Sequence, residues 1–395
     1  NAGPLDAART SAGRSAAQTV ARVHKVRVAP LSRHLATAAA RSLAYDLHGW
    51  FIRFGFWGRC CVDVQQLEED WAVRAGAREA RLVAASHVPA ALSMLGIVQP
   101  GDRLVAFADD FADAFARGFD ACDVVLVGEP SVAAFAVASE GFATAFDAEV
   151  PHLWWFVNSI GGFGLRVPDL RALGRAAREA HALLVVDNTV ASAFGCDPLR
   201  LGAALSLEAL DRVCAGEAPR KLVAVSVARS QLKRHRVDAA AECTHALLEG
   251  CGLAKLDLTA DEADVLERGL DSLDARMQAH FDRARALAEY LAANEMVRNV
   301  RYPGLGSHPD HAVATGILEH GFGPAVEFDL IERSAGELFD TLPGEFRTSP
   351  AGGATTRLSA PRGKQGSTIR LFAGTDDPLV VASTLDNALR KLATL

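Results

Sequence analysis

Short apolar runs alternate with longer amphipathic segments between about residues 63 and 258. The apolar runs read RLVAAS, DRLVAF, CDVVLVG, LWWFVN and LLVVDN, and segments with helical periodicity separate most of them. Buried strands that alternate with helices of ten or more residues indicate a mostly parallel sheet with helices on both faces. The pattern therefore predicts a large α/β domain.

The pattern changes after residue 258. A long charged amphipathic region, TADEADVLERGLDSLDARMQAHFDRARALAEYLAANE, is followed by a Gly/Pro break at YPGLGSHP and then by mixed strand and helix patterns. This change predicts a second, smaller α+β domain. We expect an N-terminal arm over 1–50, the large α/β domain over 51–257 and the C-terminal domain over 258–395. Two domains suit this length because single cores rarely grow beyond ~250–300 residues.

Composition narrows the class of protein. Half of the residues are hydrophobic, and the formal net charge is −7. The negative charge argues against a protein that binds nucleic acids or anionic membranes. No apolar run reaches the ~20 residues of a membrane span. The seven cysteines lack metal-binding spacing, which favours reduced thiols in a cytoplasmic protein.

The first 40 residues are rich in Ala, Arg and Ser and nearly free of acids. That composition is similar to a transit peptide, but without a clear cleavage signal an arm that packs on another subunit is favoured. The chain starts NAGPLD without a methionine, as expected of a trimmed or excised piece.

Five segments carry a resemblance to a known family. They are PGDRLVAFADDF at 100–111, LLVVDNT at 183–189, RGLDSLDARM at 268–277, VRYPGLGSHPDH at 300–311 and TIRLFAGTDDP at 368–378. In this order and spacing they resemble the Cys/Met-metabolism family of pyridoxal-phosphate (PLP) enzymes, which includes cystathionine synthases and lyases and methionine γ-lyase. The resemblance covers roughly 50–395. It implies a fold-type-I PLP-transferase-like architecture and a homo-oligomer, a dimer or a tetramer.

The resemblance also implies a cofactor site. A carboxylate must keep the pyridine nitrogen of PLP protonated, a ring must stack on the cofactor, and donors must hold the phosphate. The positions that the resemblance assigns to these tasks are Asp187 for the carboxylate, Phe111 for the ring, and Ser86, His87 and Val88 for the phosphate. The family's phosphate-binding arginine falls on Gly58, and Arg59 lies next to it.

A substrate site is implied in the same way. Arg370 matches the arginine with which the family binds the amino-acid carboxylate, and an arginine can hold a carboxylate through two hydrogen bonds. Ser349 falls near the serine that supports this arginine. Asn158 begins the segment that replaces the family's ESPSNP motif.

The lysine that binds PLP covalently is not found at its expected place. Aligned without gaps from Gly202, the chain has Arg212 at the lysine position. A guanidinium stays protonated and is a poor nucleophile, so Arg212 cannot bind the cofactor covalently. Lys221 and Lys233 lie nearby in the sequence, but using either would shift the register, and we expect solvated surface lysines. The sequence therefore predicts no covalently bound cofactor, with PLP held only non-covalently if at all.

Three functional hypotheses follow. The first is a pseudoenzyme that acts as a binding or partner subunit, with a protein partner left open. The second is an enzyme that reuses the pocket for a small anionic ligand or non-covalent PLP. The third is a PLP-dependent carbon–sulfur lyase or synthase. Weaker signals are disfavoured: a dinucleotide site at GGFG, a sulfur carrier at Cys60–Cys61, and a metal site at His308 and His311.

Overall fold

The computed structural model describes residues 64–111, 117–147, 150–218, 220–229, 238–251, 256–331, 333–361 and 366–393. The predicted arm over 1–50, Arg59 and the Cys60–Cys61 pair lie outside the described residues, as does Lys233.

A seven-stranded sheet forms the centre of the large domain. Its order is β1-β7-β6-β5-β4-β2-β3, and β3, β2, β4, β5 and β6 pair in parallel. Strand β7 is antiparallel to both of its neighbours, β1 and β6. The bounds are β1 (Glu79–Val83), β2 (Arg103–Phe107), β3 (Asp123–Val127), β4 (Leu153–Asn158), β5 (Ala182–Asp187), β6 (Leu205–Ala209) and β7 (Val223–Val227).

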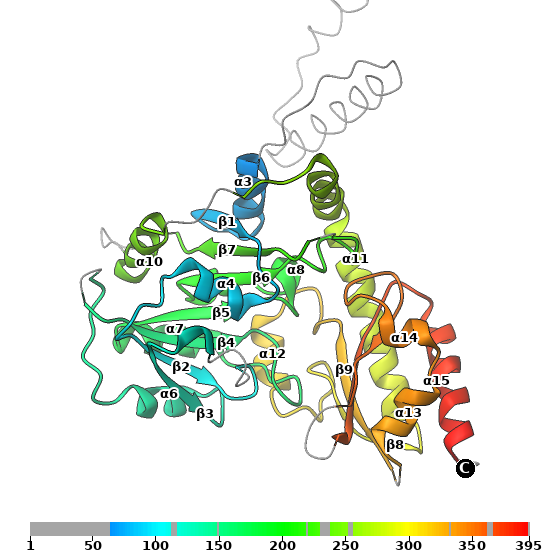
Figure 1. Ribbon diagram of the computed structural model, residues 1–395. Helices are drawn as coiled ribbons and strands as arrows, with labels where there is room; N and C mark the ends of the chain where they lie inside the picture. Colours follow the sequence, from blue (N-terminus) through cyan, green and yellow to red (C-terminus); the bar gives the residue numbers. More distant parts are fainter. Residues whose placement is uncertain are drawn as a thin grey trace, which may run out of the picture. The chain divides into compact units, whose positions relative to one another are not determined.

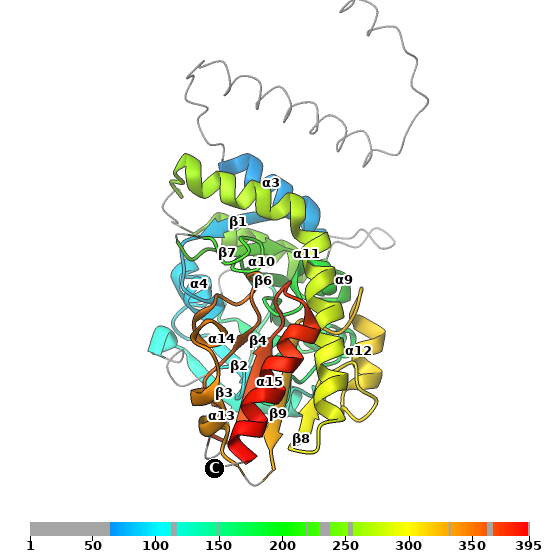
Figure 2. The ribbon, with the colours of Figure 1, turned by 90° about the vertical axis from the view of Figure 1, so that its right-hand side faces the viewer.

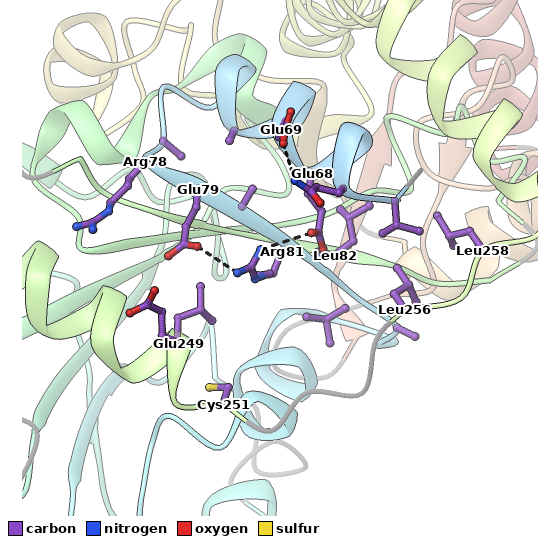
Figure 3. Close-up of a pocket in the computed structure, with 18 of the residues that line it drawn as sticks. Glu68, Glu69, Arg78, Glu79, Arg81, Leu82, Glu249, Cys251, Leu256 and Leu258 are labelled. Carbon is purple, nitrogen blue, oxygen red and sulfur yellow. Dashed lines mark hydrogen bonds and ion pairs between the residues drawn. The ribbon is translucent and has the colours of Figure 1, made fainter. Parts of the chain in front are cut away.

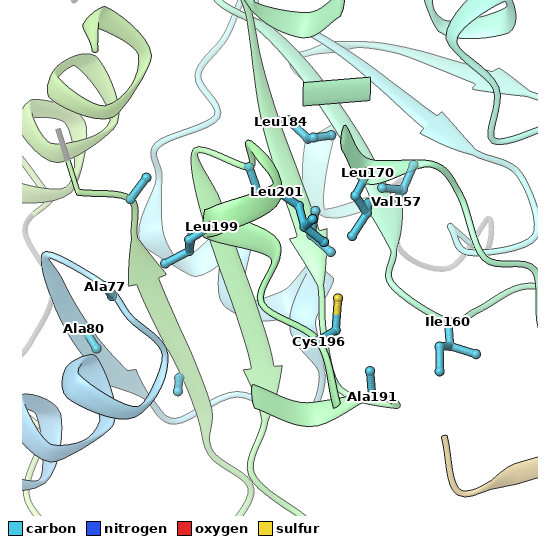
Figure 4. Packing of buried hydrophobic residues seen from close by; sticks show 14 of the residues in the cluster. Ala77, Ala80, Val157, Ile160, Leu170, Leu184, Ala191, Cys196, Leu199 and Leu201 are labelled. Carbon is cyan, nitrogen blue, oxygen red and sulfur yellow. The ribbon is translucent and has the colours of Figure 1, made fainter. Parts of the chain in front are cut away.

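Helices cover both faces of this sheet (Figure 1). Side chains alternate between faces along a strand, so Trp155 and Leu184 join one apolar cluster while Trp154 and Leu183 join another. Figure 4 shows part of the first cluster, including Leu170 and Leu184. The helical elements are α3 (Val64–Arg74), α4 (Val88–Leu95), η1 (Arg117–Phe119), α6 (Val132–Ser139), α7 (Leu170–Glu179), α8 (Ser192–Gly195), α9 (Pro198–Leu201) and α10 (Ala239–Glu249).

The C-terminal part contains a four-stranded antiparallel sheet in the order β10-β11-β9-β8. Helices α11 and α15 lie side by side along it (Figure 2). The elements are α11 (Ala260–Ala292), β8 (Val297–Arg301), α12 (His311–Ile317), β9 (Ala325–Leu330), α13 (Ala335–Thr341), α14 (Gly344–Thr348), β10 (Arg357–Leu358), β11 (Thr368–Phe372) and α15 (Pro378–Ala393).

The 33-residue helix α11 links the two sheets. A capping box of Thr259 and Glu262 fixes its start, its early part contacts α3, and its later part packs on β8 and β9. The predicted fold class, a mostly parallel α/β sheet followed by a smaller α+β part, is confirmed. The exact domain boundary at 257/258 stays a prediction, since the compact unit runs from Val62 to Leu395. Within the described ranges, no helix is long and apolar enough to span a membrane.

Candidate active site

The carboxyl ends of the parallel strands bring the predicted site residues together. Asp187 ends β5 and pairs in register with Asn158 at the end of β4, while Leu207 of β6 lies beside it on the other side. Asp110 follows β2, and its Oδ2 accepts a hydrogen bond of 2.9 Å from the Asn158 backbone N–H. Ligands of open α/β sheets bind at this edge, so the topology places these side chains where chemistry is expected.

Burial strongly affects the two acids at this edge. Burial raises the pKa of Asp110 to about 7, and the nearby Asp187 carboxylate adds to that shift. Burial also raises the pKa of Asp187, although hydrogen bonding to Thr189 and the charge of Arg212 oppose it. The Thr189 N–H donates to Asp187 Oδ1 at 2.9 Å and fixes the carboxylate. A cation beside Asp187, such as a protonated pyridine, would keep it ionised.

Arg212 lies in this cluster. Its side chain is only 4% exposed, and burial lowers its pKa while the carboxylates of Asp211, Glu208 and Asp187 oppose the shift. Its guanidinium lies 5.4 Å from the centre of the Phe372 ring. Arg212 and Asp187 therefore lie close enough in the folded chain to affect one another's charge.

Helix α11 holds the loop that carries Arg212. Arg276 donates to the backbone carbonyls of Arg212 at 2.7 Å and of Val213 at 2.8 Å. Gly269 packs so closely on this loop that a Cβ there would stand 2.1 Å from the Val213 carbonyl oxygen. The loop is thus fixed by backbone contacts that tolerate little change.

Arg370, the predicted carboxylate-binding residue, lies on β11 and already has an internal partner. Its Nε donates to Glu327 Oε1 at 2.7 Å, and its Nη2 donates to the Gly162 carbonyl. Glu327 is fully buried, and its second oxygen accepts from the Gly164 N–H at 2.7 Å. The pair therefore orients the guanidinium toward the loop that follows β4.

The segment predicted to hold the phosphate lies at the same edge of the large sheet. Val83 of β1 and Ala209 of β6 both pair with Val223 of β7, so the loop after β1 emerges beside the loop after β6. Ser86 is exposed, Val88 is buried, and His87 is the N-cap of α4, with Nδ1 accepting from the Ala90 N–H at 3.1 Å. The helix N-terminus suits an anion, although His87 already satisfies one of its donors.

Phe111 and Ser349, two further predicted site residues, make contacts within the chain. Phe111 is buried and packs on Phe119 and Phe156, with ring centroids 5.7 and 5.5 Å away. Ser349 follows α14 and donates to the Glu345 carbonyl at 2.6 Å. The functional roles of these residues, like those of the other predicted site residues, stay predictions.

Sequence reasoning missed several residues of the cluster: Asp110, Glu208, Arg276, His280 and Glu327. Burial raises the pKa of Glu208 to about 7 and lowers that of His280 to about 4. Two of them gave a signal in the sequence. Asp110 lies within the quoted ADDF segment, and Glu208 interrupts the apolar strand LSLEAL.

Known proteins resemble the chain in sequence and structure. It is 29% identical over 171 residues to a cystathionine β-lyase of Lactococcus lactis, a match that covers 43% of this chain and 42% of that protein. It is 29% identical over 290 residues to O-acetyl-L-homoserine sulfhydrylase 1 of Thermus thermophilus, covering 68% of each. The chain thus spans less than half of the length of the first of these relatives.

Solved structures are similar over most of the chain. A methionine γ-lyase from Micromonospora echinospora aligns with a TM-score of 0.66 and 28% identity over 83% of this chain and 85% of that one. A cystathionine γ-synthase from Xanthomonas oryzae aligns with a TM-score of 0.67 and 25% identity over 84% and 86%.

The sequence model of the family described as Cys/Met metabolism PLP-dependent enzyme matches residues 59–364. This match contradicts our prediction that no cofactor is bound covalently, because the resemblance implies that such enzymes hold PLP on a lysine. The prediction was wrong: it rested on a register without gaps, which rejected Lys221 and Lys233. In the structure, the connection from β6 to β7 returns Lys221 to the same sheet edge, where its Nζ lies 2.5 Å from Asp211 Oδ1. Its side chain is 55% exposed, as expected of a surface lysine. The chain belongs to the Cys/Met metabolism PLP-dependent enzyme family.

Proposed function

We propose that the chain is a PLP-dependent carbon–sulfur lyase or synthase that acts on sulfur-containing amino acids. The observation that carries this proposal is the position of Asp187 at the carboxyl edge of the parallel sheet, within a chain matched by a PLP-enzyme family. The relatives are named as lyases, sulfhydrylases and synthases. These names favour the third hypothesis over a pseudoenzyme.

The residues present fit PLP. Asp187 would hold the pyridine nitrogen, and the turn from Ser86 to Val88 at the start of α4 would hold the phosphate. Bound PLP withdraws electrons from the α-carbon of an amino acid and so weakens its bonds. Arg370, oriented by Glu327, would bind the substrate carboxylate.

Lys221 is the residue we propose for covalent attachment. It precedes β7 and pairs with Asp211 in the loop that carries Arg212. Of the lysines that the described ranges contain, Lys391 lies near the end of α15, away from this edge. Asp211 would keep the Lys221 amine near the site. Arg212, buried beside Asp187, would set the charge of the pocket.

Spectroscopy and peptide mapping test the proposal. The protein purified with PLP is expected to absorb in the visible, to lose that band on borohydride reduction, and to release thiol from cystathionine or a related amino acid. Mass mapping after reduction is expected to find the pyridoxyl group on Lys221. Lys221→Arg is expected to abolish both the band and the activity, whereas the control Lys391→Arg retains them.

Absence of a pyridoxyl adduct on every lysine, together with no thiol release, would refute the proposed function. An adduct on another lysine would leave the function intact and reject only Lys221 as the attachment residue. The homo-oligomer and the cytoplasmic location expected from the sequence stay predictions.

A further inference from the structure

A small polar cavity of about 170 Å³ lies where α3 meets the segments that follow β5. Helix α3 supplies one part of its wall, and the strands β6 and β7 supply another. The polar and charged lining includes Arg74, Asn188, Asp197, Glu208 and Glu319, and Arg200 pairs with both Asp197 and Glu319. Asp187 and Arg370 do not line the cavity, but Glu208 does, so the cavity lies next to the candidate active site.

Three atoms of the lining residues are buried without a hydrogen-bond partner among the described residues: Arg74 Nε, Asn188 Oδ1 and Glu208 Oε1. Asn188 and Glu208 are only 1% and 3% exposed. Because a buried polar group without a partner costs free energy, these atoms indicate that something absent from the chain itself satisfies them.

The same three side chains are held rigidly by their other polar atoms. Asn188 Nδ2 donates to the Cys196 carbonyl at 3.0 Å. Glu208 Oε2 accepts from the Ala193 N–H at 2.8 Å, and Arg74 pairs with Asp274 through Nη2. Each side chain is therefore fixed with one polar atom left over, which is the arrangement of a preorganised binding site.

The backbone next to the cavity is strained. Ser192, which begins α8 directly before Ala193, has a φ of +64° although it is not a glycine, and its side chain lies beside the Glu208 carboxylate. Left-handed backbone at a serine costs energy and persists where the surroundings require it. Here it brings the Ala193 N–H to Glu208.

The unsatisfied atoms require a ligand with two chemical properties. Asn188 Oδ1 and Glu208 Oε1 accept hydrogen bonds, whereas Arg74 Nε donates one and carries positive charge. The two acceptors favour an ammonium group, and Arg74 Nε favours an oxygen acceptor such as a carboxylate. A molecule that carries an ammonium group and a carboxylate satisfies all three.

We propose that this cavity binds a small α-amino acid in its zwitterionic form, with the ammonium on Asn188 and Glu208 and the carboxylate on Arg74. The volume is that of about five or six water molecules, which limits the side chain to a few atoms. Glu208 also lies close enough to Arg212 to affect it electrostatically. The proposal does not depend on the proposed function.

A larger open groove offers a contrast. It lies between α3 and β1 and measures about 1620 Å³. Its charged side chains pair with one another, since Arg81 lies 3.6 Å from Glu68 and 3.3 Å from Glu79 (Figure 3). Among the described residues that line the groove, Arg220 Nε is buried without a hydrogen-bond partner, whereas the smaller cavity has three such atoms.

Calorimetric titration with glycine tests the proposal, with acetate and methylamine as probes that each carry one half of the zwitterion. Visible spectra recorded in parallel separate the two sites, because binding in the cavity leaves the cofactor band in place. We expect glycine to bind at least about tenfold more tightly than either half. We also expect Arg74→Gln and Glu208→Gln each to weaken glycine binding by about tenfold or more. Arg81→Gln, in the groove, is the matched control and is expected to bind glycine like the parent.

Glycine binding that is unchanged in both variants, or no tighter than that of acetate and methylamine, would overturn the proposal. Crystals of the parent protein soaked in glycine provide a test that needs no variant. Density for glycine between Arg74 and Glu208 supports the proposal, and water alone in the cavity refutes it.

Discussion

Asp102 and His152 show how single buried residues set local electrostatics. Asp102 accepts hydrogen bonds from the backbone N–H groups of Gln99 and His152 and from Trp154 Nε1, at 2.7 to 2.9 Å. Burial would raise the pKa of Asp102, but these hydrogen bonds outweigh it and the pKa is lowered. His152 Nδ1 lies 3.7 Å from the same carboxylate, and its Nε2 lies 3.6 Å from Cys243 Sγ. The Asp102 interaction raises the pKa of His152 to about 9.

The raised pKa of His152 predicts a pH-dependent stability. Its contribution is fully present below the unfolded pKa of 6.5 and is lost as pH rises through about 9. We expect the free energy of unfolding to fall by on the order of 3 kcal/mol across this window. Urea denaturation from pH 6 to pH 9.5 measures it. His152→Gln should remove most of this slope, whereas His181→Asn, at an exposed histidine, should keep it. An unchanged slope in His152→Gln would contradict the assignment.

At the scale of elements, the packing of α11 on the loop after β6 decides where Arg212 lies. The contact is close only because residue 269 lacks a side chain, since a Cβ would stand 2.1 Å from the Val213 carbonyl oxygen. Arg276, two turns along the helix, donates to the same loop. Helix and loop therefore fit as one unit.

Gly269→Ala is expected to destabilise the protein by about 3 kcal/mol or more, because the Val213 backbone must move. Gly316→Ala is the matched control: Gly316 also lies in a helix, α12, and a Cβ there meets no atom within 4 Å. The control should leave stability unchanged or raise it by up to about 1 kcal/mol. Equal unfolding free energies for the two variants in urea would rule out the close packing.

At the scale of the whole described unit, a buried ion pair within the C-terminal sheet ties that sheet to the loop after β4. Arg370 of β11 and Glu327 of β9 pair at 2.6 Å, and both also bond to the loop after β4, through the Gly162 carbonyl and the Gly164 N–H. Arg166 adds a second link to Asp310, at 2.6 Å. The C-terminal sheet is thus tied to the same loop that leaves the candidate site.

Removing one charge of this pair leaves the other buried and unpaired. Glu327→Gln is therefore expected to cost about 3–5 kcal/mol of unfolding free energy. The control Asp386→Asn breaks the exposed pair with Arg390, which measures 2.8 Å, and should cost at most about 0.5 kcal/mol. Differential scanning calorimetry of both variants checks this. Similar losses in the two variants would show that burial of the Glu327–Arg370 pair does not matter.

Much of the fold could be predicted from the sequence. Strand runs such as LWWFVN and LLVVDN are apolar up to their polar ends because both faces of the sheet are covered, and that pattern is local. The alternation of such runs with helices indicates parallel connection, and the same argument places Asp187 at the carboxyl edge. The family resemblance rested on short contiguous segments, which can be found in the sequence before the fold is known.

The tertiary structure decided what depends on residues distant in the sequence. Spacing alone separated Lys221 from Asp211, but the return of β7 along β6 brings them together. Likewise, the sequence indicated that Arg370 binds a substrate carboxylate but did not indicate a partner within the chain. The pairing of β9 with β11 places Glu327 beside it. The unsatisfied atoms of Arg74, Asn188 and Glu208 come from three separate elements. Charge pairing and hydrogen-bond satisfaction depend on distances in space, which local sequence patterns do not fix.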